Sequence, residues 1–130
     1  TFKAIFQTEM IRSIDFVREN LAKKESLVID ARSADRFNSL VPEPRADLRR
    51  GNIPNSINIP FQDMLENGKF KSVENLARLF KENKSENKSL VFSCGSGITA
   101  CIVLLAAELA FEGNKSIYDG SWTQWAQLEN

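Results

Sequence analysis

Short apolar runs alternate along the chain with segments whose apolar residues recur every three or four positions. The runs at 27–29 and 89–92 are typical of strands that are buried on both faces. Helical spacing predicts one helix over 13–23 and a second helix that opens at Ser72, because a serine stands at the N-cap position of each. The Ala- and Leu-rich stretch 100–111 predicts a third helix.

The remaining segments are expected to be short or irregular. Residues 2–6 form either a first strand or an extended arm, and 33–50 is polar and loop-like. Trp122 and Trp125 lie on one face of a predicted terminal helix, where we expect them to pack in the core. Further short elements are predicted as strands at 57–59 and 115–118, turns at 51–56 and 83–88, and a short helix at 61–65. The alternation of strands and helices predicts an α/β domain with a mainly parallel central sheet flanked by helices.

The composition fits one ordered domain. The chain has 130 residues, enough for a single core, and 42% of them are hydrophobic. Lys plus Arg equals Asp plus Glu at 17 each, so a zero net charge argues against nucleic acid or an anionic membrane as the main partner. No apolar run reaches the length of a membrane span, and no signal peptide is visible.

The chain has no histidine and only two cysteines, Cys94 and Cys101. The lack of histidine excludes Ser–His and Cys–His catalysis and most zinc arrangements within the chain, so we expect no metal and no cofactor. If both cysteines flank one helix start, they lie on the order of 10 Å apart at about 1.5 Å per residue, beyond the roughly 7 Å limit for a disulfide. A structural disulfide is therefore not expected, which favours a reducing compartment. We expect Cys101 to pack in the core, because free cysteine is among the most buried residue types.

Cys94 lies between a predicted strand and a predicted helix, in the loop Ser93 to Ala100. Gly95 and Gly97 allow the backbone to curl tightly there, because neither has a Cβ. A curled backbone at the start of a helix points successive N–H groups at an anion, which here is the Cys94 thiolate. The loop thus favours a nucleophilic cysteine over the alternative of a small buried packing residue.

Arginines are concentrated in and beside the segment 33–50. Five of the eight in the chain lie there: Arg32, Arg36, Arg45, Arg49 and Arg50. Because arginine binds carboxylates through two parallel hydrogen bonds, this segment suggests an anionic ligand. The alternative is pairing with nearby acids such as Glu43 and Asp47, which we favour for Arg49 and Arg50. Asp30 and Arg32, at the end of a predicted strand, are expected to pair as structural support.

The loop sequence CGSGITA, Cys94 to Ala100, resembles the active-site loop of the rhodanese superfamily in the version carried by mercaptopyruvate sulfurtransferases. The resemblance covers nearly the whole chain, since further motifs stand in the family's order: Asp30-Ala31-Arg32, Arg36-Phe37, Pro42 to Arg45, Gly51 to Pro60 and Tyr118 to Trp122. It is a resemblance to the C-terminal, catalytic half of two-domain enzymes. Asn52 and Asn55 depart from the usual His and Gly without putting the fold in doubt.

The resemblance implies a rhodanese-like fold over 1–130 and a sulfurtransferase that carries sulfur as a persulfide on Cys94. It implies that Arg36 and Arg45 hold the carboxylate of 3-mercaptopyruvate, and that Asp30 and Arg32 support the loop. The active-site loop itself would stabilise the thiolate and the persulfide through Gly95, Ser96, Gly97, Ile98 and Thr99. The implied partners are a small sulfur donor and an acceptor, either cyanide or a thiol such as thioredoxin. The natural chain would also carry an N-terminal rhodanese-like domain. We expect the protein in the cytoplasm or the mitochondrion.

Three alternatives remain at this stage. Thiosulfate-preferring relatives carry two basic or bulky residues where this chain has Gly95 and Ser96, which favours mercaptopyruvate over thiosulfate as the donor. A non-catalytic rhodanese module for binding or regulation is weakened by the intact cysteine loop. A cysteine phosphatase of the same fold would need a longer loop and an arginine where this chain has Ala100, so it is the least favoured.

Overall fold

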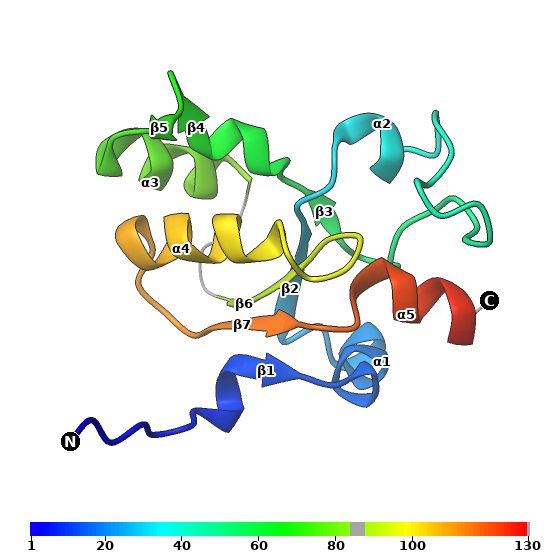
Figure 1. Ribbon diagram of the computed structural model, residues 1–130, viewed down its shortest axis with the longest axis horizontal. Coiled ribbons are helices and arrows are strands. Elements are labelled where there is room, and N and C mark those ends of the chain that lie inside the picture. Colours follow the sequence, from blue (N-terminus) through cyan, green and yellow to red (C-terminus); the bar gives the residue numbers. More distant parts are fainter. Residues whose placement is uncertain (84–87, 130) are drawn as a thin grey trace.

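A computed structural model describes residues 1–83 and 88–129. Its elements in chain order are η1 (Thr8–Met10), β1 (Ile11–Arg12), α1 (Ile14–Lys23), β2 (Ser26–Asp30), α2 (Ala34–Phe37), β3 (Ile57–Asn58), η2 (Phe61–Met64), β4 (Leu65–Glu66), β5 (Lys69–Phe70), α3 (Val73–Glu82), β6 (Ser89–Ser93), α4 (Ala100–Ala110), β7 (Lys115–Tyr118) and α5 (Ser121–Leu128), where η marks a 3-10 helix. Figure 1 shows the central strands with helices on both sides.

The central sheet has the strand order β1-β7-β6-β2-β3, and all its neighbouring pairs are parallel. Asp30 at the end of β2 is in register with Ser93 at the end of β6. The loops that follow these two strands therefore leave the sheet at the same edge, where α/β folds place their ligands. The predicted α/β class and mainly parallel sheet are confirmed.

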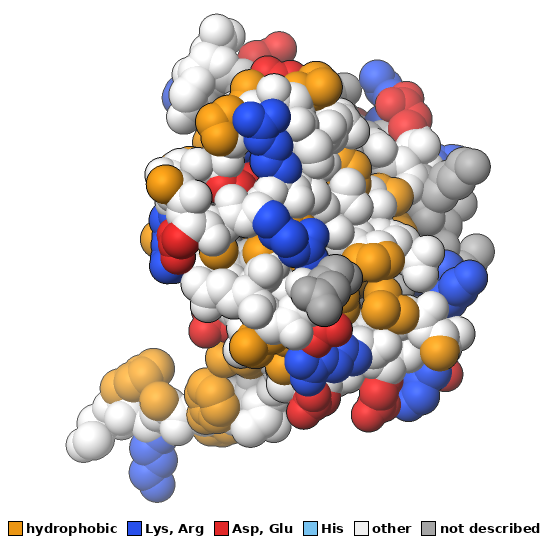
Figure 2. All heavy atoms as spheres, turned by 90° about the vertical axis from the view of Figure 1, so that its right-hand side faces the viewer, with side chains coloured by type: hydrophobic (Ala, Val, Ile, Leu, Met, Phe, Trp, Pro, Cys, Tyr) orange, Lys and Arg blue, Asp and Glu red, His pale blue; other side chains and the backbone are white. Residues whose placement is uncertain are grey.

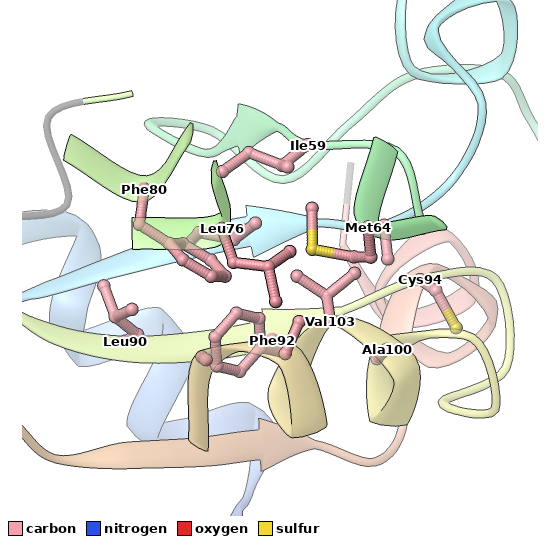
Figure 3. Close-up of a cluster of buried hydrophobic side chains, with 13 residues drawn as sticks. Ile59, Met64, Leu76, Phe80, Leu90, Phe92, Cys94, Ala100 and Val103 are labelled. Carbon is pink, nitrogen blue, oxygen red and sulfur yellow. The ribbon is translucent and has the colours of Figure 1, made fainter. Parts of the chain in front are cut away.

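Each face of the sheet is covered by its own hydrophobic layer. Leu90 and Phe92 of β6 face α3 and α4, and they pack with Leu76, Phe80 and Val103, as Figure 3 shows. The side chain of Val91 points to the opposite face, as the alternation of a strand requires, and packs with Val17, Trp122 and Trp125. The expectation that both tryptophans belong to the core is confirmed, because both are buried.

The predicted helix starts are confirmed at both serines. The Ser13 hydroxyl accepts a hydrogen bond from the Phe16 amide at 3.2 Å, and the Ser72 hydroxyl accepts one from the Asn75 amide at 3.2 Å. The predicted turn at 51–56 also forms, because Asn55 adopts a positive φ of 63° and the Ser56 amide donates to the Ile53 carbonyl. These signals succeed because each depends on contacts within a few residues.

Three segments decide between the sequence-based expectations or extend them. Residues 2–6 form an exposed extended arm rather than a strand, and Figures 1 and 2 show the N-terminal end leading away from the body. The segment 33–50 contains the short helix α2, and the hairpin of β4 and β5 was not predicted. Residues 84–87 of the predicted turn at 83–88 lie outside the described residues. None of the described helices is both long and apolar enough to cross a membrane.

Candidate active site

Cys94 lies directly after β6, at the edge of the sheet where the loop leads into α4. Its side chain is only 2% exposed, and Figure 3 places it at the loop end of the core layer. The Gly97 amide N–H donates a hydrogen bond to Cys94 Sγ at 3.0 Å. Where the sequence predicted several successive N–H groups around the sulfur, the structure shows one backbone donor directed at it, from three residues further along the loop.

Gly97 is required by both its backbone and its surroundings. Its φ is +92°, a conformation that residues with a Cβ rarely adopt, and a Cβ there would lie 2.9 Å from the Asp119 carbonyl oxygen. Gly97 is thus the residue that turns the loop back on itself, and the β7–α5 corner packs directly against it.

A buried chain of alternating charges lies behind the loop. Arg32 is fully buried and binds Asp30 and Glu43 through separate nitrogens, at 2.7 Å and 2.8 Å. The predicted Asp30–Arg32 pair therefore forms. Glu43 is itself buried and its second oxygen accepts a hydrogen bond from Arg36, so one carboxylate joins the two arginines. Arg32 also lies over the Trp122 ring, with its guanidinium carbon 5.0 Å from the ring centroid.

A cavity of about 320 Å³ opens onto the sulfur. Its lining includes Cys94 and four of the five other predicted loop residues, together with both predicted substrate-binding arginines: Gly95, Ser96, Ile98, Thr99, Arg36 and Arg45. Gly97 contributes its amide from behind the lining, and Asp30 and Arg32 stay outside the cavity. Figure 2 views the end of the molecule toward which this loop projects, and basic side chains stand there among mostly uncharged atoms.

The two arginines of the cavity are held differently. Arg36 is about a quarter exposed, fixed by buried Glu43, and its terminal nitrogen lies against Gly95. Arg45 is exposed and pairs with Asp47 at 3.1 Å, also at the surface. Arg36 is thus oriented before any anion arrives, whereas Arg45 is free to reorient because surface pairs are weak.

The comparisons with known proteins agree with this geometry. The model of the rhodanese-like domain family matches residues 13–128. The chain belongs to this family. It is 45% identical to mouse 3-mercaptopyruvate sulfurtransferase over 95% of its own length and 42% of that protein. It is 39% identical to the Escherichia coli enzyme of the same name, over 95% of the chain and 44% of the relative. The chain therefore spans less than half the length of these relatives.

A solved structure shows the same relationship. The sub-stoichiometric sulfur transferase subunit of yeast mitochondrial complex I superimposes with a TM-score of 0.87 at 38% identity, over 95% of this chain and 45% of that one. The rhodanese-like fold of the present chain is thus shared with a protein whose name states sulfur transfer.

Cys101 corrects one sequence-based expectation about this rhodanese-like domain. It is exposed rather than packed in the core, and both cysteines are free. Cys101 shares the solvent side of α4 with the half-exposed Leu105 and Leu109, four and eight residues on, while Ala100 and Val103 face the sheet. The helix is apolar around most of its circumference, so its periodicity did not distinguish the two sides.

Arg49 and Arg50 were expected to pair with nearby acids, and both instead donate hydrogen bonds to backbone carbonyls. Arg49 donates to the Glu129 carbonyl and lies over Trp122, and Arg50 donates to the Ser39 carbonyl. Neither lines the cavity. Four residues of the cavity lining were not predicted as site residues: Glu43, Pro44, Leu48 and Thr123. Glu43 had been considered only as a partner for solvated arginines. The proline residues on both sides of Glu43 gave no sign that it would be buried.

Proposed function

We propose that this rhodanese-like domain is a sulfurtransferase that takes sulfur from 3-mercaptopyruvate onto Cys94 and passes it to an acceptor. The observation that carries the proposal is the position of Cys94 Sγ, which receives the Gly97 N–H and opens onto a cavity shared with Arg36. The names of the mouse and Escherichia coli relatives support the same donor.

In the first step the Cys94 thiolate attacks the sulfur of mercaptopyruvate and forms an S–S bond. The bond between sulfur and carbon 3 breaks, and its electron pair remains on carbon 3 as an enolate stabilised by the neighbouring ketone. The thiol proton of the donor is transferred to that carbon, so the products are pyruvate and a Cys94 persulfide anion. Atoms and charge balance without a further reactant. The Gly97 amide, which already meets the sulfur, would stabilise the charge at this position.

In the second step a thiolate acceptor attacks the outer sulfur of the persulfide. The S–S bond breaks, the electron pair returns to Cys94 as thiolate, and the acceptor carries the sulfur away. Thioredoxin, a small thiol or cyanide would serve as acceptors because each is a nucleophile for sulfur. The open cavity supports access from solvent to the buried sulfur.

Arg36 and Arg45 would bind the carboxylate of the donor. Both line the cavity with Cys94, and Arg36 is held in place by Glu43. A guanidinium can offer two parallel N–H groups to a carboxylate, which suits an α-keto acid whose charge lies away from its sulfur. The loop between Cys94 and Thr99 has no cation, and this supports mercaptopyruvate over the compact dianion thiosulfate.

We further propose that 1–130 forms a single catalytic domain and that the natural protein also carries an N-terminal rhodanese-like domain. The relatives are more than twice as long as the matched region, which supports this arrangement. A purely regulatory module is the second candidate, and it differs in predicting no turnover by Cys94.

The direct test of function is a sulfur-transfer assay with mercaptopyruvate and cyanide, followed as thiocyanate and pyruvate. We expect the parent and Cys101→Ala to turn over alike, because Cys101 lies outside the cavity lining. Cys94→Ser should fold and be inactive, because an alcohol neither ionises at neutral pH nor forms a persulfide. Comparable turnover by Cys94→Ser would overturn the proposal, as would an inactive parent.

A further inference from the structure

Ser121, the first residue of α5, has a backbone conformation that serine seldom adopts. Its φ is 52°, in the left-handed region, and the residue is completely buried. Its hydroxyl accepts a hydrogen bond from the Cys94 amide at 3.0 Å and donates one to the Tyr118 carbonyl at 3.0 Å. The hydroxyl therefore ties the end of β7 to the backbone of the cysteine that follows β6.

The next two residues of α5 hold the same loop. The Trp122 amide donates to the Cys94 carbonyl at 2.9 Å, and the Thr123 amide donates to the Gly95 carbonyl at 2.9 Å. The Thr123 hydroxyl donates to that same Gly95 carbonyl at 2.6 Å. Three consecutive residues thus make four hydrogen bonds to two consecutive residues of the active-site loop.

These bonds decide which way the neighbouring amides point. In a planar trans peptide the C=O and the N–H are directed to opposite sides. Because the carbonyls of Cys94 and Gly95 point to α5, the amide N–H groups of Gly95 and Ser96 point away from it. Gly95 and Ser96 line the cavity that also contains Cys94. The bonds from α5 therefore turn two amide donors away from the protein side of the loop.

We infer that Ser121 and Thr123 are positioning residues for the loop. The Ser121 hydroxyl fixes the peptide plane between Ser93 and Cys94, and the Thr123 hydroxyl fixes the plane between Gly95 and Ser96, so that Cys94 and the loop amides keep the arrangement in which the amides can stabilise a charged sulfur. The inference deepens the proposed function and rests on it for its biological meaning. Neither hydroxyl contacts Sγ, and each acts through the backbone of Cys94 or Gly95. This role also explains why a serine occupies a left-handed position that would suit glycine better: glycine would lack the hydroxyl.

Ser93 provides a matched control. It directly precedes Cys94, is completely buried like Ser121, and its hydroxyl has no hydrogen-bond partner in the described part of the chain. Ser93→Ala also removes a buried hydroxyl next to Cys94, yet among the described residues it breaks no hydrogen bond to the loop backbone. A general effect of altering a buried serine near Cys94 would appear in both variants.

The test measures the rate of alkylation of Cys94 by iodoacetamide at neutral and at alkaline pH. It uses the Cys101→Ala background, because Cys101 is exposed and would react as well. The alkaline rate serves as the reference for each variant, so the ratio of the two rates reports how well the loop supports a nucleophilic sulfur at neutral pH. Folding of each variant is checked by circular dichroism and thermal melting.

We expect Ser121→Ala to slow alkylation at neutral pH about tenfold relative to alkaline pH, because the loosened loop would lose about one amide hydrogen bond to the charged sulfur. Ser121→Gly should behave in the same way, because relieving the backbone does not restore the hydroxyl. Thr123→Val should lower the ratio about threefold, since the Thr123 amide still holds Gly95. Thr123→Ser should match the parent, and so should Ser93→Ala.

An unchanged ratio in folded Ser121→Gly and Thr123→Val would overturn the inference, as would an equal change in Ser93→Ala. Thr123→Val keeps the test decisive if the Ser121 variants do not fold. Alkylation needs no sulfur donor, so the result is independent of the proposed activity. If the parent transfers no sulfur from mercaptopyruvate while the alkylation pattern holds, the proposed function fails and the positioning role stands.

Discussion

The guanidinium of Arg36 lies against Gly95 so closely that a Cβ at Gly95 would come within 2.8 Å of its terminal nitrogen. Gly95 is therefore small for a reason beyond backbone freedom: it leaves room for the arginine that faces the cavity. The loop and the anion-binding residue were predicted separately from the sequence, and here they depend on each other. Donor choice should respond to the size of residue 95 as well as to its charge.

Gly95→Ala should weaken the capture of mercaptopyruvate, because the methyl group displaces Arg36 from its place beside Glu43. We expect KM for mercaptopyruvate to rise about tenfold, on the scale of one charge-assisted hydrogen bond, with a smaller change in kcat. Steady-state kinetics with mercaptopyruvate measures both constants. An unchanged KM for mercaptopyruvate would show that Arg36 does not bind it.

Substitution of the two cavity arginines tests directly whether they bind the carboxylate of the donor. Arg36→Ala should reduce kcat/KM for mercaptopyruvate roughly ten- to a hundredfold, and Arg36→Lys should recover only part because the two-pronged geometry is lost. Arg45→Ala should have a smaller effect, since Arg45 is exposed and pairs with Asp47. If both alanine variants retain the parent kinetics, the carboxylate is bound elsewhere.

Glu43 should matter more for stability than any surface acid. It is buried between Arg32 and Arg36, so Glu43→Gln leaves Arg32, also buried, without one of its two charge partners. We expect the free energy of unfolding in urea to fall by about 3 kcal/mol. Asp47→Asn breaks the exposed pair with Arg45 and should cost less than about 1 kcal/mol. Equal losses in the two variants would contradict the buried network.

Tyr118 is the single tyrosine of the chain, so its titration can be followed by absorbance without interference from another phenol. Burial raises the pKa of Tyr118 to about 12, from 10.0. The neutral hydroxyl is therefore favoured in the folded state, and the stability it contributes is present below pH 10 and lost as the pH rises through about 12. A tyrosinate midpoint near 10 in the folded protein would contradict the burial.

The sequence was informative where the relevant chemistry is local. The buried strands β2 and β6, the serine caps and the loop Gly95 to Thr99 are encoded within a few consecutive residues, and the Asp30–Arg32 pair spans two positions. Features that depend on distant segments were less accessible. Ser121 meets Cys94 across 27 positions only because β7 lies beside β6 in the sheet. Neither the hydrophobic periodicity nor the spacing of motifs along the sequence predicts that these two strands are neighbours.

Burial was the second property that local patterns did not determine. Glu43 stands in a polar, proline-containing segment and is nevertheless enclosed, because two arginines from other positions neutralise it. Cys101 stands in an apolar helix and is nevertheless exposed. In both cases the polarity of the neighbouring sequence predicted the wrong degree of burial, because burial depends on how distant segments pack.

Loop charge offers a further test of donor preference. We expect the parent to prefer mercaptopyruvate over thiosulfate, and Gly95→Arg combined with Ser96→Lys to shift the ratio of kcat/KM toward thiosulfate. The electrostatic part of this shift should weaken as salt is added, whereas the displacement of Arg36 should persist at high salt. A parent that prefers thiosulfate, or a folded double variant with an unaltered ratio, would show that neither charge nor space at this position sets donor choice.

The central claim is that Cys94 carries the transferred sulfur, and mass spectrometry tests it most directly. The protein is incubated with mercaptopyruvate without an acceptor, and the sulfur gained is compared with the pyruvate released. The account predicts one added sulfur atom on Cys94 for each pyruvate, retained in Cys101→Ala and absent in Cys94→Ser. Sulfur found on Cys101 instead, or pyruvate released by Cys94→Ser, would contradict it.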